Sequence, residues 1–562
     1  MRRREWLALA AAPAAGMAAG AAKWSGAGEE VAGEAGAGRA PGSGGAGAEA
    51  AGQAAGAGGA ENAVAQAPAA SGVPGAGAGG GAFAGEAAPP TPPDRLDQGP
   101  FGIEQDEGWF TIAFATPATA PVRNFGWGLV GYTWEEGGPS LAARRGEETL
   151  ERHVEKMAAL PMADVLYIRC DWRDVQSQPG RLDLSPVWRL TLDAARRRGL
   201  RVAFRVQLSS PNIQPRRLSM PDFVRDRVPL VKIGRNFIEP RYDHPAFQAA
   251  FRELNGLLAA EFDGNPLMEW VDLMQYGFWG EGHTSDLPNP FPGYTTARDT
   301  FLDMTRRQLE AWKRTPLAVN TQPDISNVGN REVIDLAVRQ GCWLRSDSVL
   351  LEEPEQIAKL AGRPPWLAVV MEDGGKRQYS TEPKALAPDA AGRPLLEQIM
   401  LHTLDLGANY WSLWTEADNI ARFAARHPEA FRALGQRLGY RLRPAWVWQR
   451  KRWGTSEVIV ALANDGVAGV PGVLRMYLES EDGRVKVGGA LDAGHPYGGR
   501  LRQASFVLPR GLEGSRMRLR AELETRGVRR PVRWACAQPI EADGAFPIRL
   551  KPLADRDWRK GV

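Results

Sequence analysis

Cysteine is scarce in this chain, and its scarcity excludes several classes of site. Only three cysteines occur among 562 residues, at Cys170, Cys342 and Cys536. Their wide spacing leaves no CxxC metal or redox motif, and an odd, small number argues against a disulfide framework. We therefore expect buried free thiols.

An excess of charge of one sign is also lacking. The 69 basic and 66 acidic side chains leave a formal net charge of +3, which argues against nucleic acid or an anionic membrane as the main partner. No basic stripe with interleaved aromatic residues follows the chain. No glycine-rich dinucleotide fingerprint follows an early strand, and no Gly-x-Ser-x-Gly elbow occurs, so dinucleotide binding and serine hydrolysis have little support.

Long hydrophobic runs are missing, and the start of the chain has only a short, mildly apolar segment. Residues 1–7 read MRRREWL, and an alanine-rich stretch follows to Ala22. A basic start, a short apolar segment and small residues predict an export signal over residues 1–24, and Arg3-Arg4 resembles the twin-arginine pattern. The apolar segment is too short and weak for a membrane span. Export would place the mature protein in the periplasm or outside the cell; the alternative is a cytosolic protein with an accidental alanine-rich start.

The length of the chain suggests two or three domains after this signal. Residues 25–98 consist mostly of Gly, Ala, Glu and Pro, which cannot bury enough apolar surface to offset chain entropy, so we expect a disordered linker. The texture then changes twice, near residues 99 and 440. We expect one domain at 99–440 and another at 441–562.

Short apolar runs alternate with amphipathic stretches between residues 99 and 440, which is typical of a parallel α/β fold. The expected strands are Phe125–Val130, Val165–Cys170, Arg201–Gln207, Trp270–Tyr276, Pro316–Asn320, Cys342–Asp347, Trp366–Met371 and Ala408–Leu413. The expected helices are Glu147–Leu160, Ser185–Arg198, His244–Glu261, Thr296–Trp312, Asn330–Gln340, Pro354–Ala361 and Pro394–Leu406. Eight such strands predict a (β/α)₈ TIM barrel. A doubly wound sheet is the alternative, disfavoured by the missing glycine-rich fingerprint.

The last 120 residues or so have period-two apolar runs separated by turn signals, which predict an antiparallel β-sandwich. The expected strands are Glu457–Ala463, Gly472–Glu479, Ala504–Leu508, Met517–Glu524 and Val532–Ala537. Such a domain is either a carbohydrate-binding module or a structural support for the barrel. The absence of an evident aromatic row favours the support.

Functional residues of a TIM barrel sit where strands end and loops begin. The candidate substrate-binding residues at these places are Arg169, Asp171, Trp172, Arg205, Gln275, Trp279, His283, Asn320, Asp347, Trp411, Trp414 and Glu416. Tryptophan suits this role because its ring matches the apolar face of a sugar, although tryptophans of the hydrophobic core are as frequent an explanation. A metal site of Glu281, His283 and Asp286 would have poor ligand geometry, so we expect His283 to form hydrogen bonds and expect neither metal nor organic cofactor.

Two glutamates stand out among the strand ends. Glu281 follows the fourth expected strand and Glu372 ends the seventh. Two carboxyl groups facing each other across a barrel mouth can cleave a glycosidic bond, one as proton donor and the other as nucleophile or base. A neighbouring arginine such as Arg169 or Arg205 would keep a nucleophilic glutamate ionised.

The segment from Gly126 to about Ala417 resembles the clan A glycoside hydrolases, near uncharacterised bacterial barrel domains distantly similar to β-galactosidases. The resemblance rests on RCDWRDVQSQPGRLD at 169–183 and YGFWGEGH at 276–283. In that clan the acid/base glutamate follows the fourth strand and the nucleophile ends the seventh, which implies Glu281 and Glu372. Two positions differ from the pattern: Gly280 stands where many members have asparagine, and no tyrosine occurs in Cys342–Ser348.

These patterns lead to one expected function and two alternatives. We expect an exported glycosidase that acts on an oligo- or polysaccharide, with its two carboxyl groups about 5 Å apart if it retains the anomeric configuration. One alternative is a catalytically silent barrel that binds polysaccharide. The other is a structural protein of the cell envelope.

Overall fold

The computed structural model describes residues 99–101, 108–134, 146–214, 216–233, 237–282, 291–373 and 389–554. The predicted export signal and linker lie outside the described residues, as do His283 and Asp286. The chain divides into two compact units, 1–87 and 88–562, and the second contains every described residue. In the part that is described, no helix combines the length and apolar character needed to cross a membrane.

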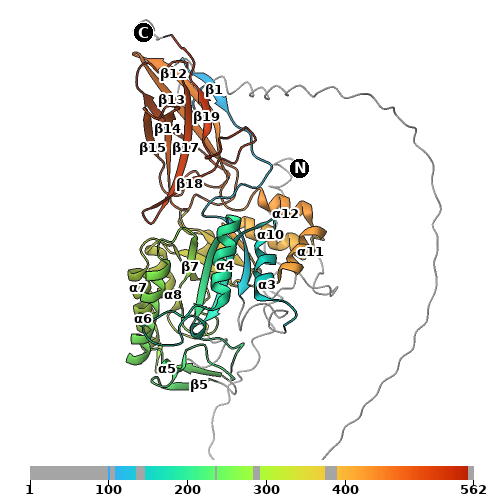
Figure 1. The fold of residues 1–562 in the computed structure, drawn as a ribbon, viewed down its shortest axis with the longest axis vertical. Coiled ribbons are helices and arrows are strands. Elements are labelled where there is room, and N and C mark those ends of the chain that lie inside the picture. The colour runs from blue at the N-terminus through green and yellow to red at the C-terminus, as the bar shows by residue number, and fades with distance from the viewer. Residues whose placement is uncertain are drawn as a thin grey trace, which may run out of the picture. The chain divides into compact units, whose positions relative to one another are not determined.

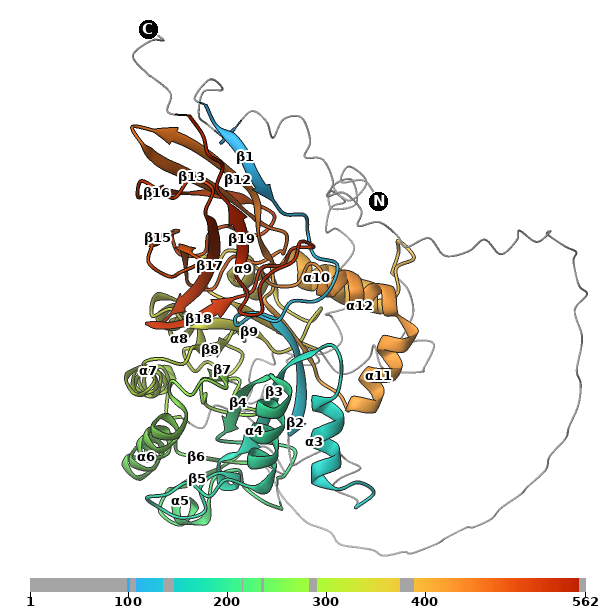
Figure 2. The ribbon, with the colours of Figure 1, turned by 45° about the horizontal axis from the view of Figure 1, so that its top comes forward.

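Eight parallel strands close into a barrel (Figures 1 and 2), so the predicted TIM barrel is confirmed. The strands are β2 (Gly128–Trp134), β3 (Ala163–Asp171), β4 (Arg201–Gln207), β7 (Met268–Asp272), β8 (Leu317–Asn320), β9 (Trp343–Ser346), β10 (Val369–Glu372) and β11 (Tyr410–Leu413). They pair in chain order, and β11 closes the barrel by pairing with β2. Each overlaps a strand expected from the sequence.

Helices surround the strands on the outside (Figure 2). They are α3 (Leu150–Ala158), α4 (Pro186–Arg198), α6 (Pro245–Phe262), α7 (Tyr294–Ala311), α8 (Asn330–Arg339), α9 (Pro354–Ala361), α10 (Leu395–Asp405), α11 (Ala417–Arg426) and α12 (Pro428–Gly435). The bounds of α4 follow from its sequence, because Pro186 suits the first helical position and Gly199 ends the helix with φ of 64°. The sequence did not predict α11 and α12.

Side chains alternate along each barrel strand between the helices and the barrel interior. In β4, Val202, Phe204 and Val206 belong to the core between strands and helices. Ala203 belongs instead to the apolar core of the interior, and Arg205 lies on that same face. The interior is therefore apolar near the beginnings of the strands and charged near their ends.

A long insertion separates β4 from α6. It contains α5 (Asp222–Arg225) and the antiparallel pair β5 (Leu230–Ile233) and β6 (Phe237–Pro240). The sequence indicated a long, proline-rich connection at Leu208–Asp243 but no strands within it. At its start, Ser209 forms a parallel bridge with Phe278, so the insertion contacts the segment that follows β7.

The C-terminal part forms two antiparallel sheets, as predicted. One contains β1 (Phe110–Phe114), β12 (Leu442–Arg452), β13 (Thr455–Asn464) and β16 (Leu501–Leu508). The other contains β15 (Lys486–Ala490), β14 (Val473–Ser480), β17 (Arg516–Thr525), β18 (Val528–Val532) and β19 (Phe546–Arg549). The strand expected at Val532–Ala537 is not formed, because β18 already ends at Val532.

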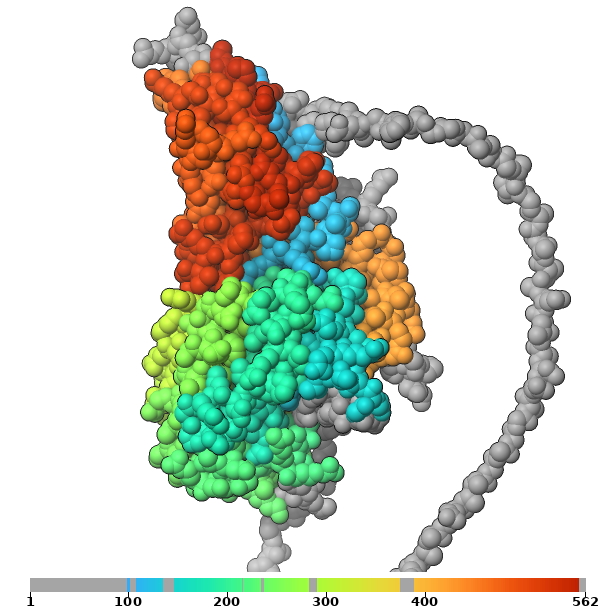
Figure 3. All heavy atoms as spheres, viewed as in Figure 1, coloured from blue at the N-terminus to red at the C-terminus, as the bar shows by residue number. Residues whose placement is uncertain are grey.

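Strand β1 belongs to this sandwich although it precedes the barrel in the sequence. It pairs with β12, and Figure 3 shows the blue N-terminal segment against the orange and red C-terminal strands. The range 99–440 therefore holds one strand of the sandwich as well as the barrel. The inner faces of both sheets join one apolar core with the amino-terminal part of the barrel interior.

Candidate functional site

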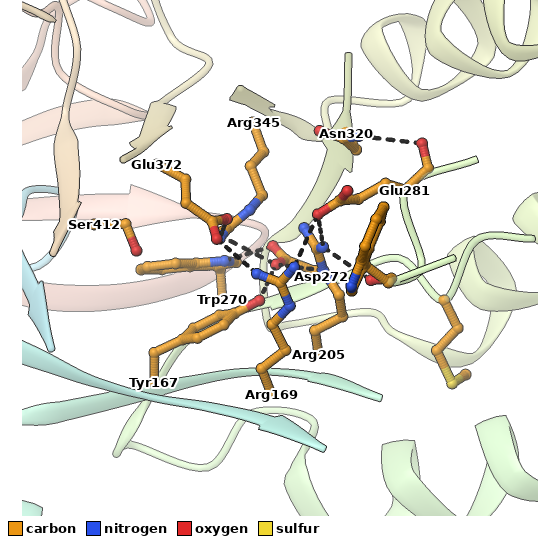
Figure 4. Close-up of polar contacts among 12 residues, drawn as sticks. Tyr167, Arg169, Arg205, Trp270, Asp272, Glu281, Asn320, Arg345, Glu372 and Ser412 are labelled. Atoms are coloured by element: carbon orange, nitrogen blue, oxygen red, sulfur yellow. Dashed lines mark hydrogen bonds and ion pairs between the residues drawn. The ribbon is translucent and has the colours of Figure 1, made fainter. Parts of the chain in front are cut away.

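Six charged side chains meet inside the barrel at the carboxyl ends of its strands (Figure 4). Five come from strands and one from the segment after β7, and each is at most 5% exposed. They are Arg169 of β3, Arg205 of β4, Asp272 of β7, Arg345 of β9, Glu372 of β10 and Glu281. These six residues are called the charged network below.

Arg169 joins the two glutamates that the sequence singled out. Its Nη1 atom donates to Oε1 of Glu372 at 2.6 Å, and its Nη2 atom donates to Oε1 of Glu281 at 3.1 Å. Figure 4 shows the guanidinium between the two carboxylates. The structure thus brings Glu281 and Glu372 together on one planar cation.

The other two arginines complete the charged network. Arg205 donates to Glu281 at 2.9 Å and to Asp272 at 3.2 Å. Arg345 donates to the second oxygen of Glu372 and lies 3.4 Å from Asp272. Each carboxylate therefore contacts two guanidinium groups, and three positive charges face three negative ones. Arginine stays protonated, so these contacts stabilise the charged form of a carboxylate.

Neutral side chains form the underside of the network. Tyr167 and the indole of Trp270 both donate to Asp272, the latter at 2.7 Å. Arg345 donates to the Tyr132 hydroxyl at 3.1 Å. Burial raises the pKa of Tyr132 and of Tyr167 well above the usual range, so both phenols stay neutral.

The segment carrying Glu281 has an unusual backbone. Trp279, Gly280 and Gly282 have φ angles of 57°, 72° and 86°, all in the left-handed region that favours glycine. A Cβ atom on Gly280 would lie 3.3 Å from Cδ of Arg205. Glycine suits position 280, because a larger side chain there would be strained by the positive φ and would lie close to Arg205. The side chain of Asn320 donates to the Glu281 carbonyl at 3.1 Å and holds the turn.

Two predicted tryptophans lie in the core. Trp172 is fully buried and donates to Gln176 at 2.9 Å, whereas Trp411 donates to Asp373 at 2.6 Å and stacks on Phe431. Both belong to the core between strands and helices. The structure corrects the sequence prediction here, because both rings pack between strands and helices, away from the barrel interior.

The other predicted residues occupy varied positions. Trp279 and Trp414 are partly exposed, and the Trp414 ring lies 5.6 Å from the Arg169 guanidinium. Asp171 accepts a hydrogen bond from Ser219 at 2.7 Å. The three arginines of the charged network contact Asp272 and the two glutamates. Glu416 is the N-cap residue of α11 and borders a cavity of about 450 Å³.

The Asp347 carboxylate lies against the side-chain amide of Gln322. The Gln322 side chain donates to Asp347 at 2.5 Å when its nitrogen faces the carboxylate. His283 lies outside the described residues. Among the described residues, no three His, Cys, Asp or Glu side chains group as metal ligands do.

The three cysteines are free thiols. Cys170 and Cys342 are buried, and Cys536 is half-buried.

Two buried glutamine side chains have no hydrogen-bond partner among the described residues. Gln207 and Gln275 are 0% and 1% exposed, and both atoms of each amide are unsatisfied. Gln207 follows Arg205 by two residues in β4 and so faces the interior. Sequence reasoning proposed Gln275 but not Gln207, although the alternation in β4 was a usable signal.

No protein-family model and no curated protein matches the chain. Among solved structures it is similar to an exo-β-1,4-mannosidase of Opitutaceae bacterium strain TAV5, with 15% identity, a TM-score of 0.32 and coverage of 59% of this chain and 58% of the mannosidase. An endo-glycoceramidase II of Rhodococcus sp. has 14% identity, a TM-score of 0.33 and coverage of 71% and 99%. A Cellvibrio japonicus xylanase has 12% identity, a TM-score of 0.32 and coverage of 52% and 86%. The similarity is distant in all three cases.

Proposed function

We propose that this protein is a glycoside hydrolase in which Glu372 is the nucleophile and Glu281 the acid/base residue. One observation carries the proposal: Glu281 from the segment after β7 and Glu372 from β10 converge on the Arg169 guanidinium at the carboxyl end of the barrel. Two carboxyl groups that reach the same small volume can act on the two sides of one glycosidic bond.

The proposed reaction has two steps. Glu372 attacks the anomeric carbon while Glu281 gives its proton to the leaving oxygen, which forms a glycosyl ester on Glu372. Glu281 then takes a proton from water, the water oxygen attacks the anomeric carbon, and Glu372 leaves as a carboxylate. The ester removes the negative charge of Glu372, so Arg169 is then left to stabilise Glu281 as the ionised base.

A second function has a specific observation in its favour. Glu281 accepts hydrogen bonds from both Arg169 and Arg205 and is 5% exposed, whereas a general acid must carry a proton before it can act. Guanidinium contacts disfavour that protonated form. A barrel that binds polysaccharide without cleaving it fits this arrangement. For cleavage, the first step above requires Glu281 to break its contact with at least one of the two arginines.

The test is hydrolysis of a panel of aryl and alkyl glycosides by wild type, Glu281→Ala and Glu372→Ala. We expect Glu372→Ala to lose about 10²–10⁴-fold on every substrate that the wild type cleaves. Glu281→Ala should lose activity on alkyl glycosides but keep most of the first step on dinitrophenyl glycosides, whose leaving group needs no proton. Glu355→Gln is the matched control, because the Glu355 side chain on α9 is 52% exposed.

The outcomes separate the two functions. Retention of the anomeric configuration, followed by proton NMR of the first product, agrees with Glu372 as nucleophile. If wild type and Glu372→Ala are equally inert across the panel while wild type still binds polysaccharide by calorimetry, the binding function replaces the enzymatic one. Inertness without any binding would leave the envelope structural protein.

We also propose that the protein is exported by a twin-arginine route. The basis is the residue pattern MRRREWL followed by small apolar residues. Cell fractionation of wild type and of a variant with Arg3→Lys and Arg4→Lys tests it. We expect wild type outside the cytoplasm and the variant retained inside; equal distribution of the two would contradict the proposal.

A further inference from the structure

A buried glutamate lies outside the charged network, in the insertion after β4. Glu239 belongs to β6 and is 0% exposed. Its two carboxyl oxygens accept hydrogen bonds from different hydroxyl groups: Oε1 from Ser209, and Oε2 from Tyr242 at 2.5 Å. The carboxyl thereby fixes one residue at each end of the insertion.

Both hydroxyl-bearing residues also bind the backbone of the segment that leads to Glu281. The Gly277 amide donates to the Tyr242 hydroxyl at 3.1 Å, and the Trp279 amide donates to the Ser209 carbonyl at 3.0 Å. These two amides lie four and two residues before Glu281. The contacts form a continuous path from the Glu239 carboxyl to the turn that carries Glu281.

The groups around this carboxyl are neutral among the described residues. Gln214, which lies near the beginning of the insertion, donates to the Ser209 hydroxyl at 3.3 Å. The Tyr242 ring packs on Tyr276 from the β7 side and on Phe291 ahead of α7. The charged neighbours of Tyr242 in sequence are Arg241 and Asp243, which pair with each other at 2.6 Å. Among the described residues, Glu239 therefore has no guanidinium of the kind that accompanies Glu281.

We propose that Glu239 is a positioning residue for Glu281: through Ser209 and Tyr242 it fixes the turn that places the Glu281 carboxyl in the charged network. The role in catalysis rests on the proposed function. The anchoring of the turn rests on the hydrogen bonds alone, and it holds whether or not the barrel cleaves a sugar.

The anchoring depends on the protonation of Glu239. Burial raises the pKa of Glu239 from 4.5 to about 7, against the lowering effect of the hydrogen bonds from Ser209, Tyr242 and Gln214. Because the folded pKa lies above the unfolded one, the stabilising contribution is complete below pH 4.5 and is lost as the pH rises through about 7. An opening that exposes Glu239 to water removes the cost of burying its charge, so we expect opening of the turn to become more frequent between pH 6 and pH 8.

Hydrogen exchange at the Gly277 and Trp279 amides measures the anchoring directly. In the wild type, exchange corrected for the intrinsic effect of pH should rise between pH 6 and pH 8, about tenfold for each pKa unit of coupling. In Glu239→Gln it should stay low at both pH values, because the neutral amide mimics the protonated carboxyl. In Glu239→Ala it should be fast throughout, and Glu355→Gln should behave as wild type.

The activity arm uses the same variants. On a glycoside that wild type cleaves, kcat/KM of wild type should fall from pH 6 to pH 8, chiefly through kcat, while Glu239→Gln should lose at least severalfold less. A displaced catalytic group costs on the order of tenfold to a hundredfold in rate. If no glycoside is cleaved, the proposed function fails, and the exchange measurement still decides whether Glu239 anchors the turn.

Two results would overturn the inference. One is an identical pH response of exchange in wild type and Glu239→Gln; the other is fast exchange in Glu239→Gln at pH 6. Should Glu239→Ala not fold, Ser209→Ala replaces it, because it removes one hydroxyl donor and keeps the carbonyl that binds Trp279. Exchange at Trp279 that is unchanged in Ser209→Ala would count equally against the inference.

Discussion

Arg169 is the side chain on which both candidate catalytic groups depend. It is 3% exposed and bonds to Glu281 and Glu372 at once. Removing the cation would leave two buried carboxylates close together, with one guanidinium fewer for each. Burial without a partner is costly for a charge, so the network stabilises the barrel only while it is complete.

We expect Arg169→Met to lower the free energy of unfolding by about 3–5 kcal/mol, because it breaks a buried ion pair by removing one partner. Urea unfolding followed by circular dichroism measures it. Arg331→Met is the control, since Arg331 pairs with Glu355 on the surface at 3.1 Å and should cost less than about 1 kcal/mol. Equal losses for the two variants would contradict the structural role of Arg169.

The unsatisfied amides of Gln207 and Gln275 give a second prediction. Each amide offers a donor and an acceptor, which suits the hydroxyl groups of a neutral sugar. On a substrate that wild type cleaves, we expect Gln207→Ala and Gln275→Ala each to raise KM about tenfold. Unfolding free energy should fall less than in Gln356→Ala, a buried glutamine of α9 that does donate a hydrogen bond, to Thr321 at 3.0 Å.

The steady-state kinetics of the three variants decide the matter. Gln356→Ala should leave KM unchanged while it loses stability. If the three glutamine variants alter KM alike, the two unsatisfied amides have no special part in binding.

The sequence predicted the two glutamates and suggested Arg169 and Arg205 as neighbours, but it did not suggest Arg345 or Asp272. Glu281 and Glu372 were visible as acidic residues at strand ends, whereas Arg345 and Asp272 gained meaning only when the strand register placed them on the inward face. The same uncertainty about facing explains Trp411, which lies between the inward residues Tyr410 and Ser412 and therefore faces the helices. A strand can be located by its apolar residues, but its facing depends on the neighbouring strands.

At the scale of elements, one carboxylate connects the ends of two helices. Asp263 is the C-cap residue of α6, and it accepts hydrogen bonds from the amides of Lys313, Arg314 and Thr315 just after α7, at 3.0, 2.9 and 2.8 Å. The backbone amides of three residues that follow α7 thus find their hydrogen-bond acceptor in a residue about fifty positions earlier.

We expect Asp263→Ala to lower the unfolding free energy by about 2 kcal/mol, because several charge-assisted hydrogen bonds are lost together. Asp193→Ala, on the exposed face of α4, should change it by less than about 0.5 kcal/mol. Thermal and urea unfolding of both variants measure the difference. A loss for Asp263→Ala no larger than that of the control would show that water replaces the carboxylate at no cost.

Elements with local signals were predicted well, and those that depend on distant partners were not. The helix at Pro354–Ala361 was predicted with the bounds that the structure has, since proline starts it and glycine follows it. Strand β1 has only five residues, FTIAF, and is held in place by β12 more than three hundred positions later. No local pattern carries that pairing.

At the scale of the whole described unit, the sandwich contacts the barrel where the strands begin, opposite the charged network. Asn124, just before β2, accepts from the Arg533 amide at 2.8 Å and donates to its carbonyl at 3.0 Å. Arg526 of the sandwich donates to the Trp312 carbonyl at 2.5 Å. These contacts favour the sandwich as a structural support.

We expect the barrel and sandwich to unfold in one calorimetric transition, because they share an apolar core. Asn124→Ala should lower its midpoint by about 1–3 °C, which corresponds to about 1–3 kcal/mol for the two lost hydrogen bonds. Asn419→Ala, on α11 away from the junction, should have a smaller effect. Two resolved peaks, of which Asn124→Ala moves only one, would show that the two parts unfold separately.

The pairing of β1 with β12 has a consequence for biosynthesis. On the ribosome β1 emerges early, yet its partner β12 is made only after the last barrel helix. The apolar residues of β1 therefore stay unpaired while the barrel is synthesised. An unpaired strand of this kind is a target for other nascent chains. The sandwich can close only when translation is nearly finished, and chaperones that shield β1 until then should raise the yield of folded protein.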